Sequence, residues 1–349
     1  MRSEAIVEFG KPLQEIEKEV PQPGGSEVLV RVRHSGVCHS DVHIQDGYFD
    51  LGSGNKLPLK LPLPHVLGHE IEGEAERIGP DARNVKVGAR YAVFPWIGCG
   101  DCVACNRGDE NFCGKPRQLG CSPGVPGGYS THVLVPHPKY LLDYGSVSPT
   151  LAAAYMCSGL TAFGAVKKVG KLGPDDQIVI LGCGGVGMMG IEFARALTGK
   201  DPKAADIDEG RLEAAIKAGA KAAYNTKDAG AAKKLTVDTK GGAFAVIDFV
   251  GSEASFTFAN SVVRRGGKII VVGLFGGGMT MPLPMLPLRG LTIMGSYVGS
   301  LDEAQEMMTL VREGKIDPIP VETRPLSAAS ESLDDLRQGR VTGRVVLTP

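Results

Sequence analysis

The sequence lacks an excess of charge of either sign: 38 Lys and Arg residues stand against 39 Asp and Glu residues, for a net charge of −1. That balance gives no electrostatic reason to expect nucleic acid or an anionic membrane as a partner. The first ten residues also lack the apolar run of a signal peptide. We therefore expect a cytoplasmic protein.

Long uninterrupted apolar segments are missing as well. One stretch without charge, 269–288, is long enough for a membrane span. Its glycines and prolines break helices, so the pattern predicts a buried strand followed by a loop. The sequence has no repeat of fixed period and no low-complexity segment. Its 349 residues are 43% hydrophobic and 22% charged, which is typical of an ordinary globular chain with two domains.

Cysteine is scarce but clustered. Four of the eight cysteines fall in "CGDCVACNRGDENFC", at positions 99, 102, 105 and 113. Cytoplasmic cysteines are usually reduced, so this cluster favours a metal over disulfides. The spacing indicates a tetrahedral zinc site, and four protein ligands make it structural. An iron–sulfur cluster is the main alternative, although the ferredoxin run closes with x3 and Pro. Unliganded thiols or a redox pair are the third reading.

A second set of ligand types is spread over "GVCHSDVH", "LGHE" and "YMCSGLT". Each piece alone is weak evidence, because a single cysteine is more often a small buried hydrophobic residue. Together Cys38, His69 and Cys157 form a Cys2His set, which leaves a fourth zinc position for water or substrate. The sequence therefore predicts a catalytic zinc site.

Polar neighbours of these three residues suit the same site. Asp41 and Glu70 are candidates to hold the second ring nitrogen of the histidine ligand. Ser40 can hydrogen-bond an alcohol at the metal, and His43 can pass its proton to solvent, since histidine titrates near neutral pH.

A nucleotide-binding pattern follows in "QIVILGCGGVGMMGIEFARAL". The apolar run 178–181 predicts a strand, and a helical pattern follows from Met188. Between them, Gly182, Gly184 and Gly187 form G-x-G-x-x-G, the dinucleotide fingerprint in this context. The glycines permit a tight turn and close approach of the pyrophosphate to the helix N-terminus.

An acidic residue about 20 positions further on completes the fingerprint. Asp206 can accept hydrogen bonds from the ribose hydroxyls and would repel a 2′-phosphate, which favours NAD over NADP. The preceding residues, "TGKDPKAAD", have little apolar character and make a poor strand. Asp208 is therefore an alternative ribose partner.

Strands and helices continue to alternate after the fingerprint, which predicts a parallel sheet. The first 150 residues instead carry short β-type runs among prolines and glycines, and the last 50 return to a helix and a strand. We expect an α/β chain: a doubly wound Rossmann domain, 159–297, inserted into a discontinuous, mainly antiparallel β domain, 1–158 and 298–349.

Through these ordered motifs and the terminal "GRVVL", nearly the whole chain resembles the zinc-containing alcohol dehydrogenases of the medium-chain dehydrogenase/reductase family. The resemblance implies a GroES-like catalytic domain, NAD, two zinc ions per chain, and reversible hydride transfer from a primary or secondary alcohol to give an aldehyde or ketone. It also implies a homodimer or homotetramer.

The resemblance assigns further roles at matching positions. The cofactor contacts it implies are His39, Thr161, Gly182, Gly184, Gly185, Val186, Gly187, Asp206, Val250, Val272 and Arg344. The segment between His43 and His69 looks about ten residues longer than in many relatives, which puts any substrate transferred from them in doubt. Tyr48, Phe49 and Trp96 are candidate apolar pocket residues, with plain packing as an equal alternative.

Three other functions compete with this one. A polyol dehydrogenase of the same family is the nearest, although many of those lack the structural cysteines. A non-catalytic nucleotide sensor would not need the full catalytic ligand set. A nucleic-acid-binding ribbon is disfavoured by the acidic residues Asp101, Asp109 and Glu110 within the cysteine loop.

Overall fold

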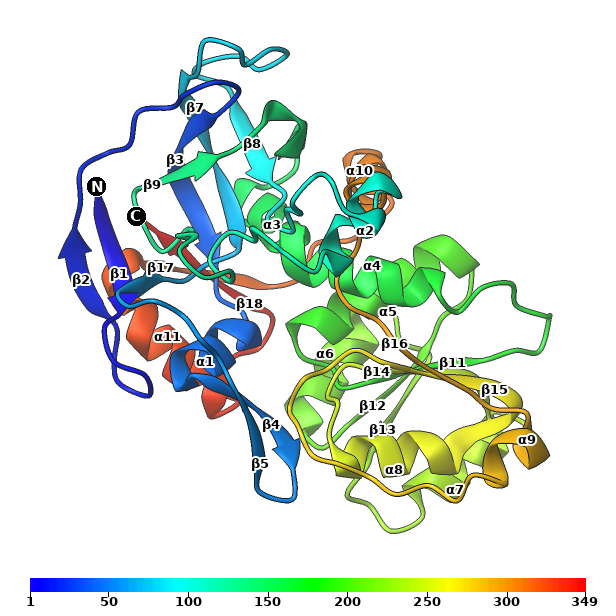
Figure 1. Ribbon diagram of the computed structural model, residues 1–349. Coiled ribbons are helices and arrows are strands. Elements are labelled where there is room, and N and C mark those ends of the chain that lie inside the picture. The colour runs from blue at the N-terminus through cyan, green and yellow to red at the C-terminus, as the bar shows by residue number, and fades with distance from the viewer. The chain divides into compact units, whose positions relative to one another are not determined.

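The computed structural model describes all residues from 1 to 349, which form two compact units. The first unit comprises Met1–Tyr48, Pro58–Leu160 and Gly299–Pro349, and the second comprises Phe49–Leu57 and Thr161–Val298. Both chain termini lie in the first unit (Figure 1).

The first unit is built on β-sheets in which nearly every strand pair is antiparallel. Its seven-stranded sheet has the order β10-β8-β7-β3-β18-β17, with β9 also paired to β3, and only β17 and β18 run parallel. A smaller sheet has the order β2-β1-β6. The strands are β1 (Arg2–Ile6), β2 (Gln14–Glu17), β3 (Val28–Gly36), β6 (His65–Val66), β7 (Glu70–Ile78), β8 (Arg90–Val93), β9 (His132–Val135), β10 (Leu141–Leu142), β17 (Val321–Pro325) and β18 (Arg344–Thr348).

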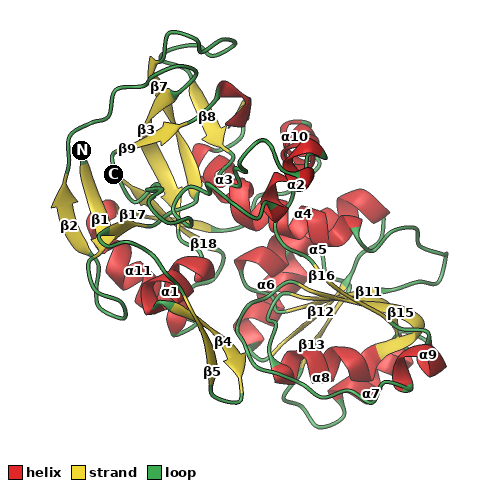
Figure 2. Ribbon diagram, in the orientation of Figure 1, coloured by secondary structure: helices red, strands yellow, loops and turns green.

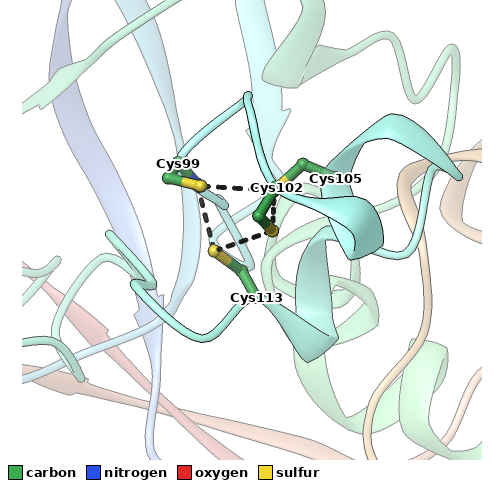
Figure 3. A group of neighbouring side chains, drawn as sticks. All are labelled: Cys99, Cys102, Cys105 and Cys113. Carbon is green, nitrogen blue, oxygen red and sulfur yellow. Dashed lines mark hydrogen bonds between the residues drawn. The ribbon is translucent and has the colours of Figure 1, made fainter.

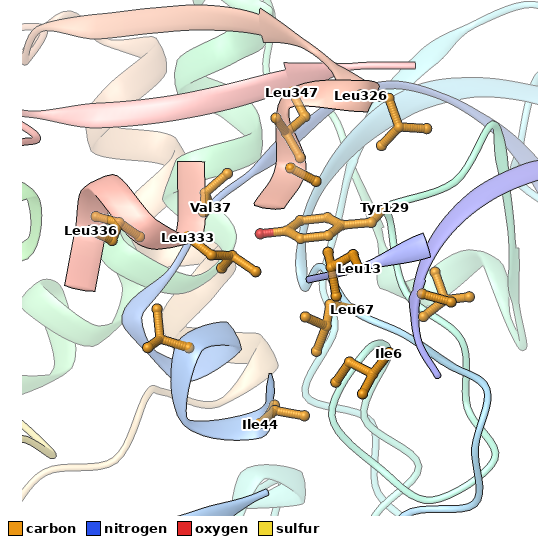
Figure 4. Close-up of a cluster of buried hydrophobic side chains, with 14 of the residues drawn as sticks. Ile6, Leu13, Val37, Ile44, Leu67, Tyr129, Leu326, Leu333, Leu336 and Leu347 are labelled. Atoms are coloured by element: carbon orange, nitrogen blue, oxygen red, sulfur yellow. The ribbon is translucent and has the colours of Figure 1, made fainter. Parts of the chain in front are cut away.

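Helices cover this sheet unit at several points. They are α1 (His39–Asp46), α2 (Val103–Asn106), η1 (Glu110–Phe112), η2 (Pro138–Tyr140), α3 (Pro149–Ala154), η3 (Tyr155–Gly159), α10 (Leu301–Arg312), η4 (Leu326–Ala328) and α11 (Ala329–Arg337). A buried apolar cluster joins α1, α11 and β18, and Figure 4 shows the ring of Tyr129 in its middle. Residues from both ends of the chain thus share one core, which makes this unit discontinuous in sequence.

The second unit is a doubly wound α/β structure. Its six strands are all parallel, in the order β13-β12-β11-β14-β15-β16, the arrangement typical of a dinucleotide-binding sheet. Helices lie on both faces of this sheet (Figure 2). The elements are α4 (Leu160–Lys167), β11 (Ile178–Leu181), α5 (Gly185–Thr198), β12 (Lys203–Asp206), α6 (Glu209–Lys217), β13 (Ala222–Asn225), α7 (Ala231–Asp238), β14 (Ala243–Asp248), α8 (Glu253–Val262), β15 (Val263–Val271), α9 (Met285–Arg289) and β16 (Thr292–Gly295). The predicted fold class is confirmed.

The long segment between His43 and His69 contains a hairpin of β4 (Tyr48–Gly52) and β5 (Asn55–Pro58). Most of this hairpin belongs to the second unit. A Cβ at Gly52 would lie 2.4 Å from the backbone nitrogen of Gly278, so here main chain packs directly on main chain.

Some sequence-based boundaries need correction. Helix α5 begins at Gly185 and not at Met188, so the last fingerprint glycine already lies in its first turn. Strand β12 is a complete buried strand although it begins at Lys203, because that side chain donates to Gln177 Oε1 over 2.8 Å. The segment 269–288 contains the short helix α9 after its strand, where only a loop was expected.

The helical segment Pro149–Lys167 is the one segment long and apolar enough to cross a membrane, by length and composition alone. Of the 18-residue apolar stretch in this segment, 83% is buried within the protein. A helix of a protein core passes the same test.

Candidate functional site

The four clustered cysteines lie around α2 and η1, and their sulfur atoms point toward one another (Figure 3). The sulfurs of Cys102 and Cys105 are 3.5 Å apart, those of Cys102 and Cys113 are 3.8 Å apart, and those of Cys99 and Cys105 are 3.9 Å apart. Four sulfurs at about 2.3 Å from one zinc ion stand about 3.8 Å apart at tetrahedral angles. The spacing therefore fits a single tetrahedral ion.

Other arrangements of these thiols fit less well. A disulfide would need sulfurs at about 2 Å, and all eight cysteines are free. An iron–sulfur cluster places several atoms between its cysteines and would hold their sulfurs farther apart than one ion does. Hydrogen bonds from the Cys105 backbone and thiol lower the pKa of Cys102 to about 6, so the Cys102 thiolate forms readily, whereas the Asp101 side chain raises the pKa of Cys99.

A buried carboxylate fastens the cysteine loop to the rest of the first unit. Glu110 Oε2 accepts from the backbone nitrogen of Gly98 over 3.0 Å and from the Tyr140 hydroxyl over 2.6 Å. Glu110 Oε1 accepts from Lys139 Nζ over 2.8 Å. Gly98 immediately precedes Cys99, so these bonds fix where the loop begins.

Cys38, His69 and Cys157 form the second cluster, with ligand atoms within 4.8 Å of one another and all three side chains buried. The two ring nitrogens of His69 are fully buried, and neither makes a hydrogen bond within the chain, although Nδ1 lies 3.2 Å from Asp41 Oδ1. A buried ring nitrogen without a partner is costly. A metal ion is the partner that this donor set fits.

The three residues come from different elements. Cys38 is the N-cap of α1, and His69 directly precedes β7. Cys157 lies in η3, a π-helical turn between α3 and α4, and such turns are frequent at functional sites. A hydrogen bond from the Cys157 thiol lowers the pKa of Cys38 well below its usual value, so a thiolate is favoured there.

Asp41 ties two of these residues together. Its Oδ2 accepts from the backbone nitrogen of Cys38 over 3.0 Å and from the Tyr129 hydroxyl over 3.0 Å. Its Oδ1 accepts from the backbone nitrogen of Gly68 over 3.3 Å and faces the ring of His69. The carboxylate thus orients both ends of the cluster.

Glu70 makes a matching connection on the other side. Its Oε1 accepts from the backbone nitrogen and the hydroxyl of Ser158, over 3.1 and 2.6 Å, next to Cys157. Its Oε2 pairs with Arg344 Nη2 at 2.5 Å. Burial raises the pKa of Glu70, and Arg344 counters that effect. Glu70 therefore does not touch the His69 ring through any hydrogen bond; it holds the strand and helix that carry the cluster.

The proton-relay candidates lie on α1. Ser40 is half-buried, and the Cys38 thiol lies 3.8 Å from its oxygen. His43 follows one helical turn later, on the same face of the helix. Burial lowers the pKa of His43 from its usual value, so its ring is neutral at neutral pH and can accept a proton. His39, also half-buried, is the first residue of the same helix.

The fingerprint of the second unit has the shape that its glycines predict. A Cβ at Gly187 would lie 1.8 Å from the Gly182 carbonyl oxygen, and Gly182 itself has a φ of +88°. A Cβ at Gly184 would meet nothing within 4 Å. Only the middle glycine therefore borders open space, where a pyrophosphate can approach the backbone.

Asp206 ends β12 and reaches the fingerprint turn. Its Oδ2 accepts from the Cys183 backbone nitrogen over 2.6 Å, and its Oδ1 accepts from the backbone nitrogens of Ile207 and Asp208 over 2.7 and 3.1 Å. The alternative residue, Asp208, is the N-cap of α6 and accepts from Arg211 N over 2.9 Å. The structure thus brings Asp206, and not the Asp208 carboxylate, to the glycine turn.

Comparison with known proteins matches both units. Residues 24–146 match the family model "Alcohol dehydrogenase GroES-like domain", and residues 185–313 match "Zinc-binding dehydrogenase". NAD-dependent alcohol dehydrogenases of Sulfurisphaera tokodaii and Saccharolobus solfataricus are 38% and 37% identical, with 100% of each chain covered. A crystal structure of an NAD-dependent alcohol dehydrogenase superimposes with a TM-score of 0.90 at 31% identity, again with 100% of both chains covered.

The chain belongs to the zinc-containing medium-chain alcohol dehydrogenases. Within this alcohol dehydrogenase chain, Trp96 packs against His69 with ring centroids 5.3 Å apart, and it donates to the Met156 carbonyl over 2.9 Å. Tyr48 and Phe49 begin β4 and are half-buried. Their pocket role stays a prediction.

The remaining predicted cofactor residues fall into two groups. Thr161 is in the first turn of α4, four residues after Cys157. Val250 is the second residue after the end of β14, and Val272 directly follows the end of β15. Arg344 is only 4% exposed, and the ion pair with Glu70 holds its guanidinium. Its predicted phosphate contact stays a prediction, since the one partner seen here is a carboxylate.

Sequence reasoning missed several residues that support the dehydrogenase site. Tyr129 holds Asp41 from 88 positions away, and Lys139 and Tyr140 hold Glu110. No local signal marks them. Ser158 could have been found from the sequence, because this hydroxyl residue directly follows Cys157, a predicted zinc ligand.

Proposed function

We propose that Cys38, His69 and Cys157 hold the catalytic zinc of an NAD-dependent alcohol dehydrogenase. The enzyme catalyses alcohol + NAD⁺ ⇌ aldehyde or ketone + NADH + H⁺. The observation that carries the assignment is the buried Cys2His cluster, whose histidine nitrogens make no hydrogen bond within the chain. Three protein ligands leave a position for substrate.

Zinc in this position supplies a Lewis acid, which can lower the pKa of bound water from 15.7 to about 7 and acidifies an alcohol hydroxyl in the same way. Ser40 lies beside Cys38 and would accept the hydroxyl proton while giving up its own hydroxyl proton toward His43, one turn along α1. His43 would take up that proton on its ring and release it to solvent. Trp96 packs on the His69 ring and restricts how the ligand can turn.

The second unit supplies the nucleotide site. The amides at the N-terminus of α5, from Gly185 to Gly187, would hold the pyrophosphate of a bound NAD, and the open side of Gly184 would let it approach. Asp206 keeps lone pairs beyond those its amide partners use, because an ionised carboxylate has about four acceptor sites. It can therefore also accept from the adenosine ribose, which favours NAD.

Cys99, Cys102, Cys105 and Cys113 hold the second, structural zinc in this proposal. The tetrahedral spacing of the sulfurs supports zinc over an iron–sulfur cluster. All four positions of the ion are filled by protein, so this metal stabilises the loop and does not touch substrate. It also favours an alcohol dehydrogenase over the polyol dehydrogenases that lack such cysteines.

A homodimer or homotetramer is the assembly we propose. Strand β16 is the outer strand of its sheet and pairs only with β15. Ile293 in this strand is 38% exposed, and Tyr297, two residues after it, is 39% exposed. An exposed apolar edge strand favours pairing with another chain, here the same strand of a second copy. None of the eight cysteines forms a disulfide, which supports a reducing, cytoplasmic location.

The test is a substrate panel followed through NADH absorbance. It contains short and long aliphatic, benzylic and cyclic alcohols together with one polyol, each with NAD and with NADP. We expect turnover of the apolar alcohols with NAD. Turnover of the polyol alone would move the protein to the polyol branch, and NADH binding without any turnover would favour a non-catalytic sensor.

A further inference from the structure

Asp248 is a fully buried carboxylate that no step of the proposed reaction uses. It ends β14 and is 0% exposed. Its Oδ1 accepts from the backbone nitrogens of Val250 and Gly251, over 2.9 and 3.0 Å, and its Oδ2 accepts from the Ser255 hydroxyl over 2.8 Å. Burial raises its pKa even against these hydrogen bonds. A carboxyl group in such a costly position calls for a specific reason.

The main chain of the same residue holds a second segment. The carbonyl oxygen of Asp248 accepts from the backbone nitrogens of Val272 and Gly273, over 2.9 and 3.1 Å. The turn after β14 and the turn after β15 are therefore both fixed to one residue. The side chain holds the first turn and the carbonyl holds the second.

These two turns pack tightly on each other and on the fingerprint. A Cβ at Gly251 would lie 1.8 Å from the carbonyl oxygen of Gly273. A Cβ at Gly182 would lie 2.6 Å from a methyl carbon of Val250. Because the Gly251 and Gly273 main chains pack this closely and the Val250 side chain lies against Gly182, a shift of the Val250 turn must displace its neighbours. The carboxyl ends of parallel strands, where these turns lie, are where such sheets bind ligands.

We infer that Asp248 is a positioning residue for the nicotinamide half of the cofactor and acts through Val250 and Val272. The inference rests on the proposed function and on the family resemblance, which implies that Val250 and Val272 contact the cofactor at its nicotinamide end. The carboxylate does not contact the cofactor. It holds the amides of the Val250 turn, and without it that turn can relax toward the fingerprint. Displacements of about 1 Å can slow a reaction about 100-fold.

The test compares NADH with ADP-ribose, which has the same adenosine, pyrophosphate and second ribose but lacks the nicotinamide. Asp248→Ala removes the acceptor, and Asp248→Asn keeps its size and one oxygen. Asp238→Asn is the matched control: its carboxylate accepts from the Tyr224 hydroxyl over 2.8 Å, in α7 just before β14 begins. Calorimetric titration gives both affinities, and steady-state assays give kcat and KM for NAD.

We expect Asp248→Ala to weaken NADH binding about tenfold or more, which corresponds to about 1.4 kcal/mol, and to lower kcat. Affinity for ADP-ribose should change less than about twofold, and Asp248→Asn should show a smaller effect of the same kind. The control should match the wild type. Equal weakening of both ligands would indicate general loosening of the unit, and unchanged NADH affinity and kcat would remove the role; either overturns the inference. Failure of the wild type to bind NADH would instead overturn the proposed function.

Discussion

Replacing Glu72 by Gln should destabilise the first unit strongly. This carboxylate lies on β7, is fully buried, and accepts four hydrogen bonds at 2.6–2.7 Å: from His34 Nδ1, from Arg90 Nε and Nη2, and from the Tyr144 hydroxyl. It therefore joins β3, β8 and the segment after β10 to the strand that follows His69.

The expected magnitude follows from those contacts. Hydrogen bonds to a charged group contribute about 1.5–3 kcal/mol each, and breaking a buried pair costs about 3–5 kcal/mol. The glutamine keeps one acceptor oxygen, and the Arg90 side chain is 38% exposed and can be rehydrated. We expect a loss of about 2–4 kcal/mol, which lowers Tm by about 4–16 °C at about 2–4 °C per kcal/mol.

The pH dependence has a definite sign. Burial raises the pKa of Glu72, but the hydrogen bonds from His34, Arg90 and Tyr144 outweigh it and hold the pKa below its usual value. A carboxyl with a depressed folded pKa stabilises above its unfolded pKa, about 4.3, and loses that effect as pH falls through the folded pKa. The difference between wild type and variant should thus be constant from about pH 5 to 7 and shrink below about pH 4.

Thermal and urea unfolding at several pH values measures this difference. Glu74→Gln is the matched control, because Glu74 lies on the same strand, is 31% exposed and contacts only Arg33 at 2.9 Å. Such a surface pair contributes about 0–1 kcal/mol. Equal losses in the two variants, or a Glu72→Gln loss below about 1 kcal/mol, would refute this reasoning.

Three further predictions concern the sites themselves. Glu110→Gln should let a chelator remove one zinc at least about tenfold faster, as expected when a residue that supports metal ligands is lost, whereas the exposed neighbour variant Asp109→Asn should not. Gly187→Ala should destabilise the second unit, since its Cβ would lie 1.8 Å from a carbonyl oxygen, while Gly184→Ala should leave stability unchanged and weaken NADH binding. His43→Ala should slow turnover about tenfold near pH 6 and little near pH 9, because the loss of a proton relay matters most where hydroxide is scarce.

Each of these has a contrary outcome. Equal chelation rates in the two acidic-residue variants would separate Glu110 from the cysteine loop. Stable Gly187→Ala protein with normal NADH affinity would contradict the fingerprint geometry. A pH profile of turnover unchanged by His43→Ala would remove that residue from the relay.

Short-range patterns made much of this protein predictable. The cysteine spacing placed four sulfurs in one loop, and the strand–glycine–helix pattern located the nucleotide turn. Both signals work because the residues involved are neighbours in sequence. Donor chemistry grouped Cys38, His69 and Cys157 as predicted zinc ligands, and the structure brings their ligand atoms together.

Contacts between residues far apart in the chain could not be predicted from the sequence. Nothing near Tyr129 indicates that its hydroxyl holds Asp41, and nothing in the β4–β5 segment indicates that most of it belongs to the second unit. Strand β13 and helix α7 went unpredicted, because "AAYN" is short and half-buried and carries no clear alternation. The start of β12 was also not predicted, because Lys203 is charged and a buried lysine needs a hydrogen-bond partner. That partner is Gln177, which only the fold brings next to it.

Zinc content and turnover of Cys38→Ser, measured on the same preparation, test the central claim most directly. The wild type should contain two zinc ions per chain, and the variant should contain one, oxidise no alcohol and still bind NADH. Cys121→Ser, which alters a thiol outside both clusters, should keep both ions and full activity. Two zinc ions or full activity in Cys38→Ser would contradict the assignment of the catalytic site.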